Sequence, residues 1–295
     1  MIKFFFKIRH SDSEVKKLIN RTADALKSAI FPAKCLACRS LFHPETKHCG
    51  HLLENCCQDE FNFISSGKTM FEGLMAPFLC TRCSVGFLPV ESPLCSGCGI
   101  MFKSREGEDH FCGECLKSPK RFSIARASGI YDHALLAAIH LLKYRGQIQL
   151  AKPLGMLLFF SFIHLWNEMP VDVVIPVPLH VKRLRKRGFN QSFLLVKDWG
   201  LYAKAIDPRL EQVHIEKHLL TRFRWTEPQT GLDRKKRQSN IKNAFKIRDA
   251  EKLNGKHVLL VDDVYTTGAT ADECAKVLLG AGAGQVDVLT LARAV

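Results

Sequence analysis

Eight of the 12 cysteines fall in four C-x-x-C pairs, which is the strongest chemical signal in the sequence. Two thiolates on a tight turn point the same way, and two such turns complete a tetrahedral Zn²⁺ shell with no open position. The pairs are Cys35/Cys38, Cys80/Cys83, Cys95/Cys98 and Cys112/Cys115. The spacing predicts one or two structural zinc sites in a reducing cytoplasm rather than the disulfides of a secreted chain.

The second site is expected to join Cys95/Cys98 to Cys112/Cys115, because residues 99–111 between them give close to the usual ribbon spacing. The first would join Cys35/Cys38 to Cys80/Cys83 across an insertion at about 39–79. The interleaved pairing of Cys35/Cys38 with Cys95/Cys98 is the alternative. The insertion also contains His43, His48, Cys49, His51, Cys56 and Cys57, whose spacing matches no closed metal site.

A run of two carboxylates and a hydroxyl-rich loop marks the other chemical centre. The apolar segment Val258–Val261 ends in Asp262 and Asp263, and the small residues Thr266–Thr270 then lead into a helical pattern over Ala271–Leu279. A strand, a loop and a helix N-terminus in this order gather free backbone N–H groups and the positive end of a helix dipole. We therefore expect a phosphate at this loop, although no Walker A motif occurs.

Two cationic segments favour anionic partners, as does the formal net charge of +14. Lys182–Arg187 places five cations after a buried strand, where a pyrophosphate or a nucleic-acid backbone would compensate them; a solvated basic loop is the alternative. Arg222–Arg237, which ends in Arg234–Arg237, has the length and polarity of a mobile flap over a site. Lys143 and Arg145 close a predicted helix, where helix capping and a ligand role remain equally open.

The elements that must position these groups alternate between strands and helices after about residue 122. This alternation predicts a mostly parallel α/β sheet with helices on both faces, whose ligands bind at the carboxyl ends of the strands. The expected strands are Phe122–Tyr131, Val171–Val177, His218–Arg222, Phe245–Ile247, Val258–Val261 and Val286–Ala292, and the expected helices are Ala134–Tyr144, Leu150–Trp166 and Phe189–Ala203.

Three regions follow from these patterns. Residues 1–33 contain an amphipathic helix, 34–118 form a double zinc ribbon with its insertion, and 122–295 form the α/β domain. The run Ile2–Ile8 is too short for a signal segment and is broken by Lys7. The most apolar stretch, Leu154–Trp166, is expected to be a buried helix rather than a membrane span.

Several of these segments resemble the motifs of a known protein family. Val258–Thr270 resembles the phosphoribosyl pyrophosphate (PRPP) loop of type I phosphoribosyltransferases. With Pro176–Leu179, Arg187–Ser192, Leu142–Gly146, Pro228–Leu232 and the four cysteine pairs, the chain from about Lys34 onward resembles the ComF family.

The resemblance implies a PRPP site. Asp262 and Asp263 would hold the ribose hydroxyls and stabilise an oxocarbenium-like transition state, and Mg²⁺ would accompany the pyrophosphate. The remaining PRPP-binding residues would be Thr266, Thr267, Gly268, Ala269, Thr270, Pro178, Leu179 and Arg187.

Three functions are compatible with such a site. The family's link to natural competence implies help with uptake or processing of single-stranded DNA, which would bind through Lys182–Arg187 and Arg234–Arg237, alongside a DNA-uptake machinery. An active phosphoribosyltransferase acting on a base or amine is the second, and a non-catalytic PRPP sensor is the third. No nucleobase-binding hood can be recognised in the sequence, so it does not name an acceptor.

Overall fold

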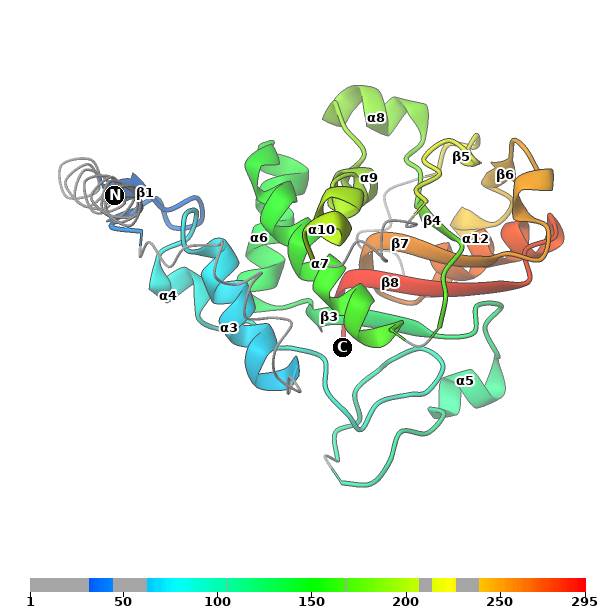
Figure 1. Ribbon diagram of the computed structural model, residues 1–295, viewed down its shortest axis with the longest axis horizontal. Helices are drawn as coiled ribbons and strands as arrows, with labels where there is room; N and C mark the ends of the chain where they lie inside the picture. Colours follow the sequence, from blue (N-terminus) through cyan, green and yellow to red (C-terminus); the bar gives the residue numbers. More distant parts are fainter. Residues whose placement is uncertain (1–31, 45–62, 105, 168, 207–213, 227–238) are drawn as a thin grey trace, which may run out of the picture.

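A four-stranded parallel sheet stands at the centre of the computed structural model, which describes residues 32–44, 63–104, 106–167, 169–206, 214–226 and 239–295 (Figure 1). The strand order is β3-β8-β7-β4, and every neighbouring pair is parallel. The strands are β3 (Ala125–Ile130), β4 (Val173–Pro176), β7 (His257–Tyr265) and β8 (Gln285–Arg293). The predicted α/β class with a mostly parallel sheet is confirmed.

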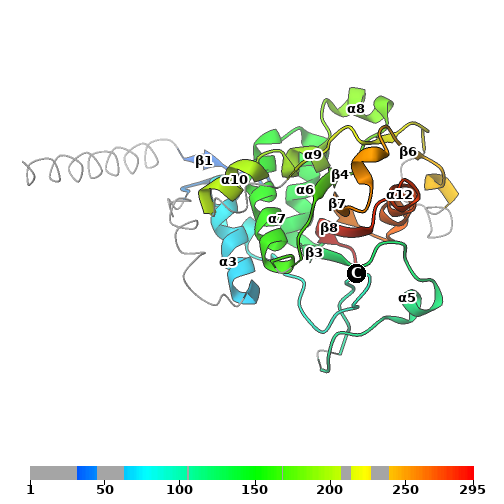
Figure 2. The same ribbon diagram turned by 45° about the vertical axis from the view of Figure 1, so that its right-hand side comes forward.

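Helices cover both faces of this sheet, as Figure 2 shows. One face carries α6 (His133–Arg145), α7 (Ala151–Leu165) and α9 (Gln191–Val196), and the other carries α12 (Ala269–Gly280). Alternate residues of β7 face the two cores: Leu259 and Val261 pack into the first, and Val258 and Leu260 into the second. A strand apolar on both faces therefore leads to the two aspartates.

Helix α7 is the most apolar element because it is enclosed by other elements. Ile148–Leu165, which includes the short turn η1 (Ile148–Leu150), is long and apolar enough to cross a membrane by length and composition, but 67% of it is buried inside the molecule. Phe159 is fully buried, with its ring 5.5 Å from that of Trp199 in α10 (Trp199–Ile206). The packing explains the apolar sequence without a membrane.

Four local features differ from the sequence predictions. The helix expected over Phe189–Ala203 is divided between α9 and α10. The predicted strands β5 (Leu220–Arg222) and β6 (Phe245–Ile247) pair with each other, antiparallel and outside the main sheet. The cationic segment forms the helix α8 (Val181–Arg187) rather than a loop. Strand β7 continues through the aspartates to Tyr265, because its pairing with β8 extends to Arg293. A one-turn helix, η3 (Glu251–Leu253), precedes β7.

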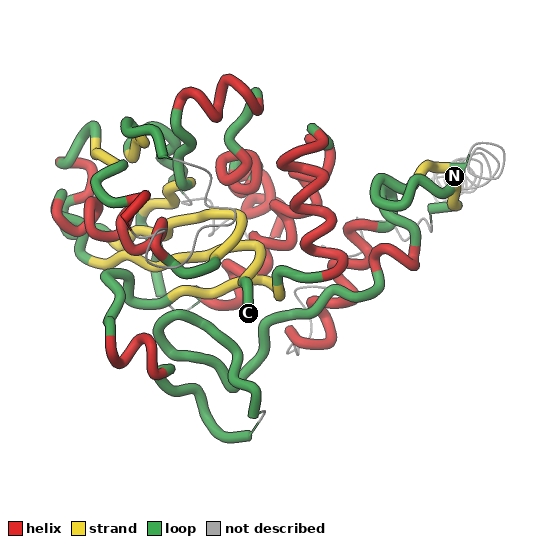
Figure 3. The backbone as a smooth tube through the Cα atoms, turned by 180° about the vertical axis from the view of Figure 1, so that it is seen from behind, coloured by secondary structure: helices red, strands yellow, loops and turns green. Residues whose placement is uncertain are grey.

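The cysteine segments lie on opposite sides of the sheet (Figures 1 and 3). Cys35, Cys38, Cys80 and Cys83, hereafter the first tetrad, belong to a region with β1 (Ala33–Lys34), β2 (Leu41–Phe42), α3 (Phe63–Met75) and α4 (Thr81–Ser84). Cys95, Cys98, Cys112 and Cys115, the second tetrad, surround α5 (Gly113–Lys117). Cys35 is part of the core beneath α6 and α7, whereas Cys95 is part of the core beneath α12.

Several predicted segments lie outside the described residues. They are the N-terminal helix within residues 1–31, the insertion residues His48, Cys49, His51, Cys56 and Cys57, the segment Pro228–Leu232 and the cations Arg234–Arg237. The three proposed domain boundaries remain predictions.

Candidate functional site

Asp262 lies near the carboxyl end of β7, where two groups hold its carboxylate. Ser192 Oγ donates to Asp262 Oδ1 over 2.8 Å, and the backbone N–H of Asp263 donates to the same oxygen over 2.9 Å. Burial and the neighbouring Asp263 carboxylate raise the pKa of Asp262 to about 7. This carboxyl can therefore accept a hydroxyl proton or exchange one near neutral pH.

The Asp263 carboxylate is neutralised by a lysine on α6, the helix that follows β3. Lys143 Nζ, on the last turn of α6, lies 2.7 Å from Asp263 Oδ2, and the two side chains are only 13% and 6% exposed. Burial opposes the charge of the ammonium, but the Asp263 carboxylate outweighs burial and raises the pKa of Lys143. The sequence left the role of Lys143 open, and the structure shows that it forms a buried ion pair.

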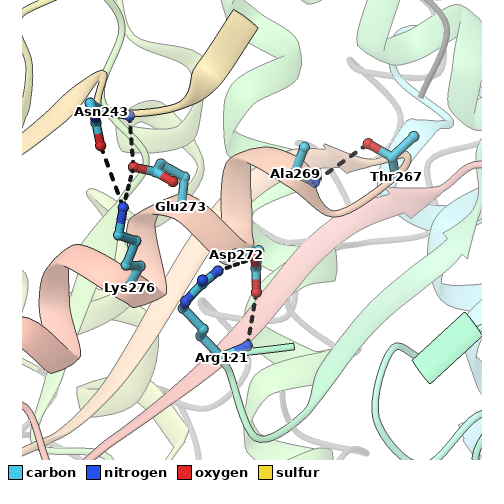
Figure 4. Close-up of polar contacts among 7 residues, drawn as sticks. All are labelled: Arg121, Asn243, Thr267, Ala269, Asp272, Glu273 and Lys276. Carbon is cyan, nitrogen blue, oxygen red and sulfur yellow. Dashed lines mark hydrogen bonds and ion pairs between the residues drawn. The ribbon is translucent and has the colours of Figure 1, made fainter. Parts of the chain in front are cut away.

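The loop after β7 turns directly into α12. Gly268 adopts φ +75° and precedes the first helical residue, and a Cβ there would lie 2.1 Å from the Tyr265 hydroxyl. Ala269 N lies 3.4 Å from Thr267 Oγ1, as drawn in Figure 4. The residues Thr266–Thr270 thus form a tight turn that leads into the N-terminus of α12.

Two contacts fix the first turns of α12 in place (Figure 4). Asp272 accepts hydrogen bonds from Arg121 N over 2.8 Å and from Arg121 Nη1 over 2.7 Å. Glu273 accepts a hydrogen bond from Asn243 N over 2.8 Å. Helix α12, which follows the loop, is therefore tied to the segment after the second tetrad and to the segment between β5 and β6.

The end of β4 lies beside the two aspartates. Val177 N donates to Val261 O over 2.8 Å, which places Pro178 and Leu179 next to Asp262 along the sheet edge. Asn190, the N-cap of α9, donates to Val177 O over 3.1 Å. Three segments far apart in sequence thus meet at the strand ends, as a ligand site of a parallel sheet requires.

Arg187 contacts residues of α9 and α6. Its Nη1 donates to Gln191 Oε1 over 2.5 Å, and its guanidinium stacks 5.6 Å from the centre of the Tyr144 ring. Its assignment to the PRPP-binding set remains a prediction.

Helix α8 exposes most of its cations and buries none of its side chains. Lys182 Nζ and Arg183 lie 5.6 Å and 5.4 Å from the centre of the Trp225 ring. The indole is 37% exposed, and His180 packs against it at 5.3 Å. Cations alternating with an accessible aromatic ring are the surface on which single-stranded nucleic acids stack.

Both tetrads have the geometry of a metal site. In each, the four Sγ atoms lie within 4.8 Å of one another, with an Sγ···Sγ separation of 3.7 Å between Cys38 and Cys80 and of 3.8 Å between Cys98 and Cys112. These distances match the edges of a tetrahedron with Zn–S bonds of about 2.3 Å. The grouping follows the expected pairing and not the interleaved alternative. The two tetrads can therefore hold metal ions, and their all-sulfur donor set is compatible with zinc.

Backbone N–H groups donate hydrogen bonds to one sulfur in each tetrad. Cys98 N and Cys112 N donate to Cys95 Sγ over 3.4 Å and 3.3 Å. Burial opposes ionisation, but these N–H groups outweigh it and lower the pKa of Cys95 to about 6. In the first tetrad, Cys80 N donates to Cys35 Sγ over 3.4 Å.

Three side chains near the candidate site were given no role by the sequence. Ser192 was within a recognised motif, but only the fold shows its bond to Asp262. Arg222 is 8% exposed and is predicted by no motif; burial and the nearby Arg183 lower its pKa to about 10. Tyr265 was assigned to neither the predicted strand nor the loop; it is the last residue of β7 and lies under Gly268.

The fold and site define an α/β protein with a four-stranded parallel sheet and two cysteine tetrads able to hold metal ions. The relatives narrow this class. DNA utilization protein YhgH of Escherichia coli O157:H7 is 33% identical over 222 residues, which cover 73% of this chain and 90% of the relative. Competence protein F of Haemophilus influenzae is 31% identical over 74% of this chain and 97% of its own length. The chain belongs to the ComF family of these proteins.

More distant matches add little. Competence protein ComFC of Streptococcus pneumoniae is 29% identical over 69% of this chain and 89% of its own length. An allosteric regulatory enzyme of purine biosynthesis has 21% identity and a TM-score of 0.28, covering 47% of this chain and 24% of that one. A phosphoribosylpyrophosphate synthetase from Mycobacterium smegmatis has 15% identity and a TM-score of 0.25, covering 48% and 33%. Neither structure is close enough to bear on the site, and no family model matches the chain.

Proposed function

We propose that this protein binds PRPP at the carboxyl end of β7 and acts in the uptake or processing of single-stranded DNA within the cytoplasm. The observation that carries the PRPP site is the junction of Asp262 with the Gly268 turn. A carboxylate that can accept ribose hydroxyls lies beside helix N-terminal amides that can donate to a 5′-phosphate. The names of the relatives support the part that concerns DNA.

The two aspartates would have different tasks. Lys143 already neutralises Asp263, so the Asp263 carboxylate would have a structural task. Its ion pair with Lys143 would hold the end of β7 in place. Asp262, held by Ser192, would receive the ribose hydroxyls and, when ionised, would stabilise positive charge that develops at C1′. Mg²⁺ would supply charge neutralisation at the pyrophosphate, where carboxylate and phosphate oxygens suit it.

Binding of PRPP can be tested by calorimetric titration with Mg²⁺ present. Asp262→Asn should weaken binding strongly while the far-ultraviolet circular dichroism stays that of the parent. Ser192→Ala is a milder companion, because it removes only the hydroxyl that holds the carboxylate. Unchanged PRPP affinity in Asp262→Asn would show that the site lies elsewhere.

An active phosphoribosyltransferase is the second candidate, and the raised pKa of Asp262 favours it. A carboxyl with a pKa of about 7 is suited to take a proton from an incoming base or amine. Incubation with PRPP, Mg²⁺ and a panel of nucleobases and amines would release pyrophosphate if any acceptor reacts. Release that vanishes in Asp262→Asn supports turnover, whereas binding without release with any acceptor favours a PRPP sensor.

The nucleic-acid surface is best sought at α8 and Trp225. Affinity for a single-stranded oligonucleotide should fall by roughly 0.7 log units per decade of salt for each phosphate contact. Trp225→Ala should cost about 1–3 kcal/mol of binding through lost stacking. Lys204→Ala, a cation on α10 away from this surface, is the control, and a flat salt response would exclude the DNA proposal.

A further inference from the structure

The phosphate loop rests on a buried aromatic ring. Tyr265 is 5% exposed, and its hydroxyl fills the space that a side chain at Gly268 would need. Since Gly268 has φ +75° and stands immediately before α12, the position of this hydroxyl limits how the turn can bend. Any shift of the tyrosine ring is therefore passed to the amides that are expected to receive the phosphate.

One arginine connects that ring to the second tetrad. Arg293 pairs with Tyr265 across the β7–β8 register, and its guanidinium lies 4.4 Å from the centre of the tyrosine ring. The same guanidinium donates through Nη1 to Cys98 O and through Nη2 to Cys98 Sγ, the latter over 3.3 Å. Arg293 is 5% exposed, so a single buried cation touches both the loop's support and a metal-binding sulfur.

Charge gives this contact its strength. Four thiolates around Zn²⁺ carry a net charge of about −2, which is costly to bury without a cation. Arg293 supplies one cation, and Arg126 Nη1 donates to Ser96 O of the same knuckle over 3.2 Å. Within the described residues, no arginine or lysine donates to a sulfur of the first tetrad. The link is thus a property of the second tetrad alone.

We infer that Tyr265 and Arg293 are positioning residues that couple metal binding at the second tetrad to phosphate binding at Thr266–Thr270, an inference that rests on the proposed PRPP site. With metal bound, the thiolates hold Arg293, Arg293 holds the tyrosine ring, and the ring holds the Gly268 turn. Linkage makes the effect reciprocal: a phosphate ligand at the loop strengthens retention of the metal. The first tetrad does not respond.

The test measures zinc release from the full-length, zinc-loaded protein into excess chelator, followed with a metal-sensitive dye. The probe is ribose 5-phosphate, because it can occupy the loop without pyrophosphate. Cys38→Ser, which disables the exposed end of the first tetrad, identifies the release phase of the second. We expect the probe to slow that phase by about fivefold, the lower end of usual coupling energies, and to leave the other phase unchanged.

Three variants separate coupling from mere structural support. Tyr265→Phe keeps the ring under Arg293 but removes the hydroxyl beneath Gly268, so zinc release without probe should match the parent while the response to the probe falls. Arg293→Met should release the second zinc faster and lose the response. Arg293→Lys should regain zinc retention through its charge without regaining the response, because it lacks the planar group that stacks on the ring.

A matched control comes from the other connection between the same two regions. Arg121 reaches Asp272 of α12 on the surface, with side chains 50% and 22% exposed (Figure 4). Arg121→Ala should keep the full response to the probe. An equal probe response in Tyr265→Phe, Arg293→Met and the parent would overturn the inference.

Calorimetry with ribose 5-phosphate distinguishes the two levels of the proposal. Probe binding without slower zinc release would overturn the coupling and leave the PRPP site intact. Absence of probe and PRPP binding would overturn both.

Discussion

The two cysteine tetrads are built from the same C-x-x-C chemistry but are joined to the fold in different ways. The first lies at the periphery, where Cys38 is exposed and its sulfur is 2.9 Å from Ser40 Oγ. The second is embedded in the core beneath α12, with Ala125 N donating to Gly97 O over 2.7 Å and Arg293 on Cys98. The comparison teaches that one motif can be an appendage in one place and a part of the core in another.

Backbone contact explains the close fit of the second tetrad. A Cβ at Gly99 would lie 2.4 Å from Ala125 O, so only glycine allows the knuckle to approach strand β3 this closely. The first tetrad instead reaches the core through side chains, with Phe71 of α3 stacked on Phe87 at 4.5 Å. The side-chain packing of the first tetrad can be lost while the sheet stays folded. The turn between Cys95 and Cys98 is held by the backbone of β3, so we expect it to be lost only together with the sheet.

The largest expected difference is in folding. Cys95→Ser should remove the second metal, a loss on the order of 10 kcal/mol that is comparable to the whole stability of a domain. We expect the sheet to lose its cooperative melting transition. Cys38→Ser should leave that transition, shifted by a few degrees, because Cys38 is the exposed member of a tetrad that is joined to the core by side-chain packing. Calorimetry together with zinc counting checks both, and similar melting of the two variants would remove the distinction.

Helix α6 offers the first tetrad a route to the site. The helix carries Lys143 at its last turn, directly after Leu142, which belongs to the same core as Cys35. Lys143→Met would leave Asp263 buried without its partner and should cost about 3–5 kcal/mol, measured by denaturant unfolding. Lys143→Met with Asp263→Asn should recover much of this loss. If Cys38→Ser produced the same PRPP defect as Lys143→Met, the first tetrad would also control the site.

A pH response separates the site's own chemistry from both tetrads. The folded pKa of Asp262, about 7, is above the unfolded value, so its contribution to stability is complete below the unfolded pKa and is lost as pH rises through 7. Asp262→Asn should therefore gain stability over the parent from about pH 4 upward, reaching roughly 2–4 kcal/mol at about pH 7.

The ligand reports the same ionisation with the opposite sign. PRPP affinity should rise over this pH range in the parent, because the ionised carboxylate accepts the ribose hydroxyls better. The midpoint should be the same in Cys38→Ser. A pH-independent difference in stability between the parent and Asp262→Asn would contradict the raised pKa.

The smallest effect is expected at Arg121→Ala. The exposed ion pair with Asp272 contributes about 0.2–1 kcal/mol, and PRPP affinity should change less than in Tyr265→Phe. Melting temperature and calorimetric titration measure the two. A larger loss of PRPP affinity in Arg121→Ala than in Tyr265→Phe would show that the surface ion pair, and not the buried contacts, connects the second tetrad to the loop.

The sequence predicted the elements better than their junctions. Apolar runs such as Val258–Val261 are local signals, and so are the cysteine spacings, which fixed the grouping of the second tetrad. The contacts Ser192 to Asp262 and Lys143 to Asp263 join residues far apart in the chain, so no local pattern reveals them. The same holds for β5 and β6, which look like sheet strands in sequence but pair only with each other.

The failure at α8 has a different cause. The sequence predicted the next helix only from Phe189 and none over Lys182–Arg187, yet His180 Nδ1 accepts from Lys182 N, and Gly188 ends the helix in the left-handed conformation. Capping, together with side chains of which none is buried, was enough to allow a helix. The aromatic partner, Trp225, is far from Lys182 and Arg183 in the sequence, and only the fold brings its ring against them.

The place of β8 between β3 and β7 has a consequence for the order of events during synthesis. Cys98 leaves the ribosome 195 residues before Arg293, which completes its surroundings. Until the last strand is made, the sheet lacks its centre and the thiolates lack both their cover and their compensating cation. Metal that binds the nascent knuckles early would protect these sulfurs from oxidation while the rest of the chain is translated. Zinc supply during growth should therefore decide the yield of folded protein more than zinc added after purification.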